Sequence, residues 1–483
     1  MVKFNHFIKY LLKERKIIMA KDKAVKPFGI ADKLGYAFGD VGNDFTFILS
    51  SSFLMKFYSD VMGVGVGIVG ILMMVARIVD AFTDVAMGQV VDRSKPTKDG
   101  KFIPWVKRMA GPVSVASFLM YATWFKDMPM AFKIFWMFFT YILWGSVCYT
   151  GVNIPYGSMA SAVSPDPKHR ASLSTWRTMG ATIAGMVISV VFPLVVYYTD
   201  ANGNQVLSGT KMAVAAGVCS VLALISYLIC CVLTTERVKV EQKTEKFDLG
   251  ALLKSLVTNK VLIGIVLASI CLLLAQLTSQ GMMTYVYPNY FKNTTAQSMA
   301  GVVMLPIMFV LAAVSTPLSA KFGRKALALF GSLLGGGIMI LAYFMHITNP
   351  WIFIGLYAIS YIGLGLFNII IWAMITDVID DTEVQTGERS DGTIYAVYSF
   401  ARKMGQAASS GLVGGLLTFI GYTSATAFDP AVTEGIYTIT CIAPATGFIL
   451  VAVILMLLYP LGKKRVDENV RILAEKRESK EQA

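Results

Sequence analysis

The sequence predicts an all-α membrane protein whose twelve transmembrane helices form two halves of six. Three observations support this fold class. Of 483 residues, 55% are hydrophobic and only 15% are charged, with a mean hydropathy of +0.61, whereas a soluble protein carries about a quarter charged residues. The apolar residues gather in runs of about 20 residues, the length of a helix that crosses the hydrocarbon core. Lysine and arginine gather in alternate loops between those runs.

Twelve apolar runs follow one another along the chain, six on each side of a charged segment at residues 235–247. Helix is the expected structure for each run, because an open strand would leave backbone polar groups without partners in lipid. The first six runs lie at residues 34–58, 64–91, 106–124, 131–162, 171–198 and 212–233. The last six lie at residues 261–290, 298–320, 326–346, 351–379, 393–420 and 436–461.

The charges in the loops predict the orientation in the membrane. One set of alternate loops is rich in Lys and Arg, apart from an acidic loop at residues 380–391, and the loops between them have few such residues. Cytoplasmic loops carry the excess of Lys and Arg. We therefore expect a multi-pass protein of the bacterial inner membrane with both termini in the cytoplasm.

The charge pattern also divides the chain into segments. We expect a cytoplasmic N-terminal segment at residues 1–33, a six-helix half at 34–234, a cytoplasmic linker at 235–250, a second half at 251–461 and a cytoplasmic tail at 462–483. Met19 is an alternative start of translation, because the residues before it can be encoded by a sequence that resembles a bacterial ribosome-binding site. We expect the short tail to be a solvated helix or coil and expect no soluble output domain.

A weak internal repeat supports the division into halves. The stretch GQVVDRSK at residues 88–95 follows the second run, and KFGRK at residues 321–325 follows the eighth. Both resemble the loop motif of the major facilitator superfamily, although Lys95 and Pro96 stand where Gly and Arg are usual. This resemblance implies a major facilitator fold, with two six-helix halves around a central cavity.

Several other kinds of site are excluded by composition. The formal net charge is +13, but the positive residues lie in short loops between apolar runs, so we expect no nucleic-acid partner. The six cysteines lie in apolar segments without CxxC spacing, which favours buried apolar side chains over disulfides or zinc ligands. We expect no cofactor, and a monomer whose partners are membrane lipid and a small molecule.

Ionisable residues inside the apolar runs are the most informative feature of the sequence. Such residues are costly in a bilayer and usually mark a substrate or ion path. A network of ion pairs that only ties helices together is the structural alternative. Lys56 and Lys133 are close enough to helix ends for their ammonium groups to reach the interface, so we assign them no role. The residues within the runs that we take as site candidates are Asp44, Arg77, Asp80, Asp84, Thr150, Asn153, Arg177 and Lys403.

Three of these residues share one face of the second helix. Arg77, Asp80 and Asp84 project within roughly 60° of one another, with Thr83 beside them. Two carboxylates one turn apart repel each other unless a positive charge lies near them. That charge can be Arg77, a proton or a bound cation such as Na⁺, for which the oxygens of Asp80 and Asp84 are suitable ligands. The sequence leaves this choice open.

Stretches along almost the whole chain resemble the glycoside–pentoside–hexuronide:cation symporter family, which includes melibiose permease and the glucuronide permeases. The matching stretches are GYAFGDVGNDF, FYSDVMGV, ARIVDAFTD, GKFIPW, VNIPYGSMASA, WAMITDVIDDTEVQTGER and YSFARKMGQA. Two of them, VNIPYGS and SFARKMGQA, are closer to the glucuronide-permease branch. The resemblance implies uptake of a sugar coupled to Na⁺ or H⁺.

The same resemblance implies two adjoining sites. A cation site is implied at Asp80, Thr83, Asp84 and Thr150, with Arg77 as a supporting charge; Thr83 stands where melibiose permease has asparagine, which leaves the choice between Na⁺ and H⁺ open. A sugar site is implied at Asp44, Arg177 and Lys403, with Asn43 and Asn153 in place of a lysine and an aspartate. Tyr149 and Trp372 are aromatic candidates for stacking on the sugar, as is Tyr398, although helix packing is the favoured role for each.

We therefore expect a symporter that imports a sugar or glycoside by alternating access, with a glucuronide or a pentoside as candidates. The loss of an acid beside Arg177 and Lys403 favours a substrate that carries a carboxylate. A drug or lipid carrier of the same superfamily is the alternative, but it would favour a more apolar cavity. A membrane enzyme or sensor is disfavoured, because no catalytic cluster and no output domain are visible.

Overall fold

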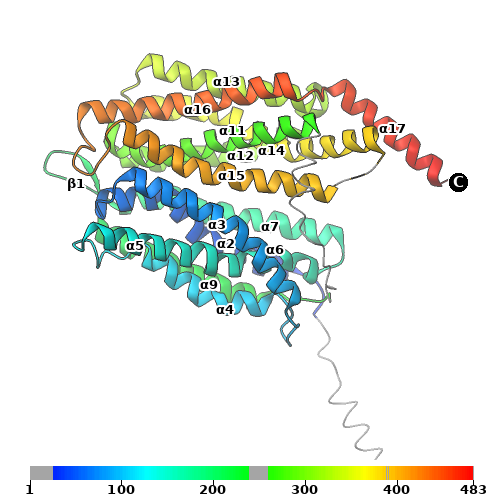
Figure 1. The fold of residues 1–483 in the computed structure, drawn as a ribbon, viewed down its shortest axis with the longest axis horizontal. Coiled ribbons are helices and arrows are strands. Elements are labelled where there is room, and N and C mark those ends of the chain that lie inside the picture. The colour runs from blue at the N-terminus through cyan, green and yellow to red at the C-terminus, as the bar shows by residue number, and fades with distance from the viewer. Residues whose placement is uncertain (1–25, 239–258, 388, 390, 482–483) are drawn as a thin grey trace, which may run out of the picture.

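In the computed structural model, residues 26–238, 259–387, 389 and 391–481 are described. Residues 1–25 of the expected N-terminal segment, which include the alternative start at Met19, and most of the expected linker fall outside these residues. The described chain is a bundle of long helices that run roughly parallel to one another (Figure 1). In the figure α2 to α9 form the lower half and α11 to α16 form the upper half.

The first half follows the predicted order of elements, with several π-helical turns (η) inserted. Its helices begin and end as follows: α2 Ile30–Lys56, α3 Val66–Arg93, α4 Ile103–Leu119, α5 Met130–Ile142, α6 Thr150–Val163, α7 Pro167–Met186, α8 Phe192–Val195 and α9 Gly209–Leu233. The π-helical turns are η1 Phe57–Val61, η2 Leu143–Tyr149 and η3 Val187–Val191.

The second half contains α11 Lys260–Tyr285, η4 Val286–Tyr290, α12 Thr294–Phe322, α13 Arg324–Met345, α14 Pro350–Thr386, α15 Asp391–Phe419 and α16 Pro430–Leu458, followed by α17 Lys463–Glu481. Short polar side chains begin several of these helices. Asn259, Asn293 and Asn349 each accept a hydrogen bond from a backbone N–H of the first turn, which satisfies donors that have no partner within the helix.

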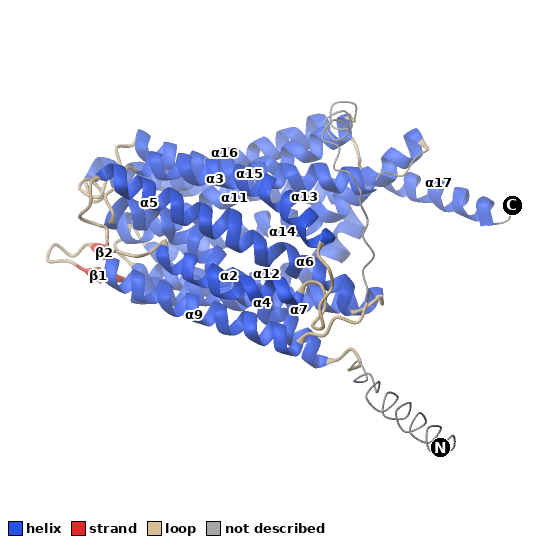
Figure 2. Ribbon diagram, turned by 60° about the horizontal axis from the view of Figure 1, so that its bottom comes forward, coloured by secondary structure: helices blue, strands red, loops and turns tan. Residues whose placement is uncertain are grey.

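The expectation of helix alone is wrong at one point. Antiparallel strands β1 (Tyr197–Thr199) and β2 (Gln205–Leu207) form a hairpin in a connection that the sequence predicts to be a loop. The end of the bundle that carries this hairpin is called the hairpin end below. The opposite end, from which α17 projects, is called the tail end (Figure 2). The hairpin lies beyond the helices, where its backbone need not be buried in lipid.

Nine helical stretches in the described residues are long and apolar enough to cross a membrane. They contain α3, α5 with α6, α7 with α8, α9, α11, α12, α13, α14 and α16. The helices α2, α4 and α15 run beside them in the bundle (Figure 1). Of these, α4 has only 17 residues, and α2 and α15 carry charged residues within the bundle, including Asp40, Asp44 and Lys403.

The two halves approach each other closely near the hairpin end. Gly70 of α3 and Gly414 of α15 face each other there. A Cβ atom added at Gly414 would lie 2.8 Å from the Cα atom of Gly70 and 2.9 Å from the carbonyl oxygen of Val66. At a separate contact between the halves, the Ser298 hydroxyl of α12 donates to the carbonyl of Val190 in η3. Small residues therefore allow backbones of opposite halves to meet at this end, as in other helix contacts in membranes.

Charged contacts organise the tail end. The guanidinium of Arg237 bonds to Asp32 at the start of α2, with N–O distances of 2.9 and 3.0 Å. Arg465 and Asn469 of α17 bond to Asp381 of α14 at 2.9 Å. The tail, which the sequence predicts to be a solvated helix or coil, is therefore a helix whose first turns are attached to the second half.

Candidate transport site

Two aspartates of α3, Asp80 and Asp84, form the centre of a polar cluster. The Ser146 hydroxyl donates to Asp80 Oδ1 at 2.5 Å, and the Thr150 hydroxyl donates to Asp84 Oδ1 at 2.7 Å. The Lys403 ammonium of α15 donates to Asp84 Oδ2 at 2.5 Å. The aspartate side chains are 15% and 16% exposed. Two carboxylates and two hydroxyls of the first half thus form one cluster with the Lys403 ammonium of the second half, and the two aspartate side chains are mostly shielded from solvent.

The π-helical turn η2 shapes one wall of this cluster. The Thr150 hydroxyl also donates to the carbonyl of Gly145, five residues earlier, at 3.1 Å. A Cβ atom at Gly145 would lie only 3.2 Å from Asp80 Oδ1, so glycine permits the close approach of the carboxylate. π-Turns within helices are frequent at functional sites. Sequence reasoning identified Thr150 but missed Ser146, because a single serine in an apolar run carries no charge signal.

The Thr83 hydroxyl bonds within its own helix. It donates to the backbone carbonyl of Asp80 at 3.2 Å. Its lone pairs stay available, so its role as a cation ligand stays a prediction. The oxygens that do surround Asp80 and Asp84 come from Ser146 and Thr150 of the neighbouring segment.

A second ion pair lies between α2 and α7. Arg177 Nε donates to Asp40 Oδ1 at 3.0 Å, and its guanidinium lies 5.3 Å from the ring centre of Tyr156. Asp44, one turn further along α2, interacts electrostatically with both Asp40 and Arg177. The sequence reasoning missed Asp40, although an acid within the first apolar run was the signal that identified Asp44. The arginine is consequently neutralised by a residue of its own half.

Asn43 of α2 is buried against a neighbouring helix of the first half. Its side chain is 1% exposed, and its Oδ1 accepts a hydrogen bond from the Tyr227 hydroxyl of α9 at 3.0 Å. Asn43 therefore lies between two helices of the first half, and its assignment as a sugar contact stays a prediction. Asn153 is only partly buried on α6.

The aromatic candidates fall into two groups. Tyr149 packs against Trp144 and Phe47, with ring centres 5.3 and 5.7 Å apart. Trp372 of α14 is 44% exposed and makes an edge contact with Tyr398 at 5.0 Å. These two groups belong to opposite halves, so only the assembled bundle can bring aromatic rings to both sides of a substrate.

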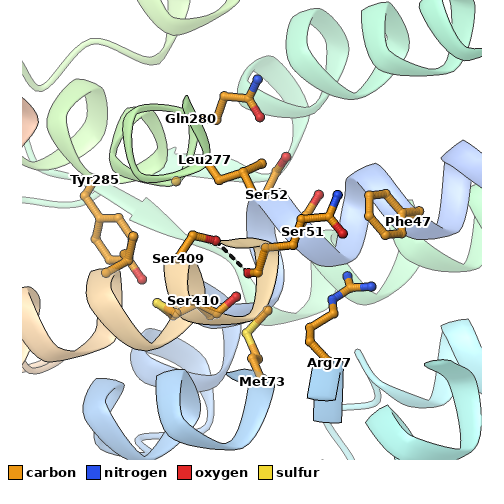
Figure 3. Close-up of a pocket in the computed structure, with 14 residues that line it drawn as sticks. Phe47, Ser51, Ser52, Met73, Arg77, Leu277, Gln280, Tyr285, Ser409 and Ser410 are labelled. Atoms are coloured by element: carbon orange, nitrogen blue, oxygen red, sulfur yellow. Dashed lines mark hydrogen bonds between the residues drawn. The ribbon is translucent and has the colours of Figure 1, made fainter. Parts of the chain in front are cut away.

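A cavity of about 80 Å³ lies between the halves, bordered by α2, α3, α11 and α15. Figure 3 shows Arg77, Ser51, Ser52, Gln280 and Ser409 around it. The wall also includes apolar and aromatic side chains, and the residues that complete it are Phe47, Met55, Met73, Leu277, Gly281, Tyr285, Gln406, Ser410 and Val413.

Buried polar contacts close the hairpin end above this cavity. Lys56 is 1% exposed, and its ammonium lies 2.9 Å from Asp60 Oδ2, 2.8 Å from Asn289 Oδ1 and 3.1 Å from the Tyr422 hydroxyl. Tyr422 also donates to Asp60 at 2.9 Å. The expectation that Lys56 reaches the membrane interface is therefore wrong. The partners of the Lys56 ammonium in the interior are Asp60 of the first half and Asn289 and Tyr422 of the second half.

Lys133 behaves differently from Lys56. Its ammonium donates to the backbone carbonyls of Met62 and Lys126, at 2.7 and 3.1 Å. These carbonyls belong to connections at the hairpin end, so the side chain does extend toward the end of the bundle.

Comparison with known proteins agrees with this architecture. Residues 35–463 match the family described as MFS/sugar transport protein. The glucuronide carrier protein homolog of Escherichia coli is 30% identical over 441 residues, which cover 90% of this chain and 94% of that one. The isoprimeverose transporter of Lactiplantibacillus pentosus is 29% identical over 453 residues, covering 91% and 92% of the two chains.

A solved structure supports the fold independently. A bacterial homologue of the human lysosomal transporter Spinster superposes with a TM-score of 0.65 at 11% identity, and covers 91% of this chain and 97% of its own. The family match and the full-length relatives together place the protein among membrane transporters and not among enzymes. The chain belongs to the sugar-transport family of the major facilitator superfamily, in its glycoside–pentoside–hexuronide symporter branch.

Proposed function

We propose that this protein imports a sugar or glycoside by symport with H⁺ or Na⁺, as a monomer in the lipid bilayer and without a bound cofactor. The observation that carries the proposal is the contact of Lys403 with Asp84 at 2.5 Å, inside a cluster of two carboxylates and two hydroxyls. This contact joins the halves that must move relative to each other during transport. A cation that binds the cluster therefore changes the contact between Lys403 and Asp84, and this contact influences from which side of the membrane the site is open.

The proposed topology has twelve spans, with α2, α4 and α15 added to the nine apolar stretches. Residues 34–234 and 251–461 form the halves, and residues 1–33, 235–250 and 462–483 lie in the cytoplasm with the tail end. The hairpin end then faces outward. Closure of that end by Lys56, Asp60, Asn289 and Tyr422 makes the present conformation the inward-facing one.

Coupling follows from competition for Asp84. In the present state the Lys403 ammonium neutralises the Asp84 carboxylate. A proton or Na⁺ at Asp80 and Asp84, with oxygens from Ser146 and Thr150 as further ligands for Na⁺, would weaken the hold on Lys403. The freed ammonium can then donate to sugar hydroxyls. By linkage, a bound sugar raises the affinity for the cation by the same factor.

The sugar is proposed to lie between the cluster and the cavity wall. Asp44 and Asn153 of the first half can accept or donate hydrogen bonds to its hydroxyls, and Lys403 can do so from the second half. Tyr149 and Trp372 offer rings on opposite sides. The names of two relatives, the glucuronide carrier protein homolog of Escherichia coli and the isoprimeverose transporter of Lactiplantibacillus pentosus, support a glycoside as the substrate.

Uptake into right-side-out membrane vesicles tests the proposal. Labelled glucuronides, pentosides and neutral glycosides are supplied while a Na⁺ gradient and a pH gradient are imposed separately. We expect at least one glycoside to accumulate above equilibrium under one gradient, and the accumulation to stop when that gradient is collapsed. If no glycoside accumulates under either gradient, the symporter assignment is wrong.

A further inference from the structure

The three cations of the predicted sites differ in how fully they are neutralised. Arg177 and Lys403 each bond directly to an aspartate, as described above. The nearest carboxylate oxygen to Arg77 is Asp80 Oδ2 at 3.7 Å, which is beyond hydrogen-bond distance. The Asp80 carboxylate instead accepts its short bond from Ser146. Arg77 therefore has the most weakly compensated charge of the three.

Aromatic rings hold the guanidinium of Arg77 in place. Its central carbon lies 4.6 Å from the ring centre of Phe47, 5.9 Å from that of Trp144 and 6.0 Å from that of Tyr141. Rings at these distances attract a cation through their quadrupoles without cancelling its charge. They also fix the orientation of the planar group. Arg77 is thus positioned without losing its capacity to bind an anion.

The guanidinium of Arg77 borders the cavity between the halves. In Figure 3 its side chain extends from α3 toward the space that Ser51 and Gln280 also face. The other polar groups on the wall are hydroxyls and amides, which match the hydroxyls of a sugar because they both donate and accept. Among the described residues that line this cavity, none carries a carboxylate. The wall therefore presents one positive group among neutral polar groups.

We infer that Arg77 binds the anionic group of the transported sugar, a carboxylate or a sulfonate, within this cavity. The fork of guanidinium N–H groups matches the paired oxygens of such a group, so the contact is bidentate. Gln280, Gln406 and Ser51 contact the hydroxyls of the same molecule. This inference rests on the proposed function. Arg77 is then a determinant of substrate specificity, whereas the family resemblance implies only a supporting charge of the cation site.

The position of Arg77 also links the charge of the substrate to the cation cluster. An anion bound to Arg77 lies close to the ionised carboxylate of Asp80 and is repelled by it. Uptake of the coupling cation at Asp80 removes this repulsion. A neutral sugar in the same cavity experiences no such repulsion. The coupling cation should therefore strengthen the binding of an anionic sugar more than the binding of its neutral analogue.

A matched set of ligands tests the inference with purified protein in nanodiscs. Phenyl β-glucoside, phenyl β-glucuronide and phenyl sulfoquinovoside share a pyranose ring and an aglycone but carry a hydroxyl, a carboxylate or a sulfonate at the same end. Binding is measured by calorimetry for the parent, Arg77→Gln and Arg77→Lys. We expect Arg77→Gln to weaken binding of the anionic ligands by about 10- to 100-fold and to leave the glucoside unchanged. Arg77→Lys should give an intermediate result.

Arg402 provides the matched control. Its guanidinium also rests on aromatic rings, 5.3 Å from Trp372 and 5.9 Å from Tyr398, but it is not among the residues that line this cavity. Arg402→Gln should keep the ratio of glucuronide to glucoside affinity. If Arg77→Gln fails to fold, combining it with Asp80→Asn restores the charge balance of that turn.

Each outcome has a definite meaning. A difference between the carboxylate and sulfonate ligands in the parent identifies which anion the cavity takes. Equal loss of all three ligands in Arg77→Gln, or a parent that binds the glucoside as tightly as the anionic ligands, would overturn the inference while leaving sugar transport intact. If the folded parent binds none of the three and no glycoside accumulates in vesicles, the proposed function itself fails.

Discussion

Replacing Tyr422 with phenylalanine should shift the protein toward a state that is open at the hairpin end. The Tyr422 hydroxyl donates to Asp60 and accepts from Lys56 across the interface of the halves, at 2.9 and 3.1 Å. Lys56 is buried and the Asp60 side chain is 12% exposed in the closed state, and both would meet water in the open one. The substitution therefore removes hydrogen bonds that exist only while the hairpin end is closed.

The size of the shift follows from the cost of those bonds. Loss of a partner of a buried polar group costs about 1–3 kcal/mol, and each 1.4 kcal/mol changes an equilibrium constant about tenfold. The population of the open state should rise roughly 5- to 150-fold relative to the closed state. The pair of Lys56 and Asp60 remains intact within the first half, so we expect no loss of folding.

Cysteine alkylation measures this shift. Ser51 is exposed and borders the cavity, so Ser51→Cys reports access from outside to a membrane-impermeant maleimide in intact cells. The control is Tyr437→Phe. The Tyr437 hydroxyl bonds to the backbone of Ala342 and Ile347 within one half, so its loss should affect both states equally. Equal alkylation rates in the Tyr422 and Tyr437 variants would refute the reasoning.

Three further predictions concern the interface and the cluster. Gly414→Ala should also favour the state open at the hairpin end, because the added Cβ atom would lie 2.8 Å from the Cα atom of Gly70. The control is Gly415→Ala, whose added Cβ atom meets nothing within 4 Å. It should leave the alkylation rate unchanged. Asp84→Asn should abolish accumulation against a gradient, because Lys403 loses its charged partner; full accumulation in vesicles would remove Asp84 from the coupling site. Asp80→Asn should make glucuronide affinity, measured by calorimetry, independent of the coupling cation, and retained dependence would contradict the proposed repulsion.

Much of the fold is readable from local patterns in the sequence. The apolar runs predict the helices because the bilayer requires a fixed length and internal hydrogen bonding. The predicted run at residues 64–91 and helix α3 at Val66–Arg93 differ by only two residues at either end. The hairpin of β1 and β2 was missed, because a short polar connection outside the bilayer carries no hydropathy signal.

The sequence also identified most of the charged residues that meet in the bundle, since a charge within an apolar run is conspicuous. It could not identify Ser146 or Gln280 in the same way, because neutral polar side chains are common in buried helices. Lys56 was misjudged for a related reason. Its position near a helix end is compatible with the interface, and its burial depends on Asn289 and Tyr422, more than two hundred residues away.

By itself, the sequence determined that the chain is a helical membrane protein in two halves with ionisable groups in its interior, because hydropathy and charge are properties of each segment alone. Only the tertiary structure decided which acid neutralises which base. It paired Arg177 with Asp40 and Lys403 with Asp84, and left Arg77 facing the cavity. Electrostatic pairing depends on the distance between side chains from different helices, and that distance is fixed by packing and not by spacing along the chain.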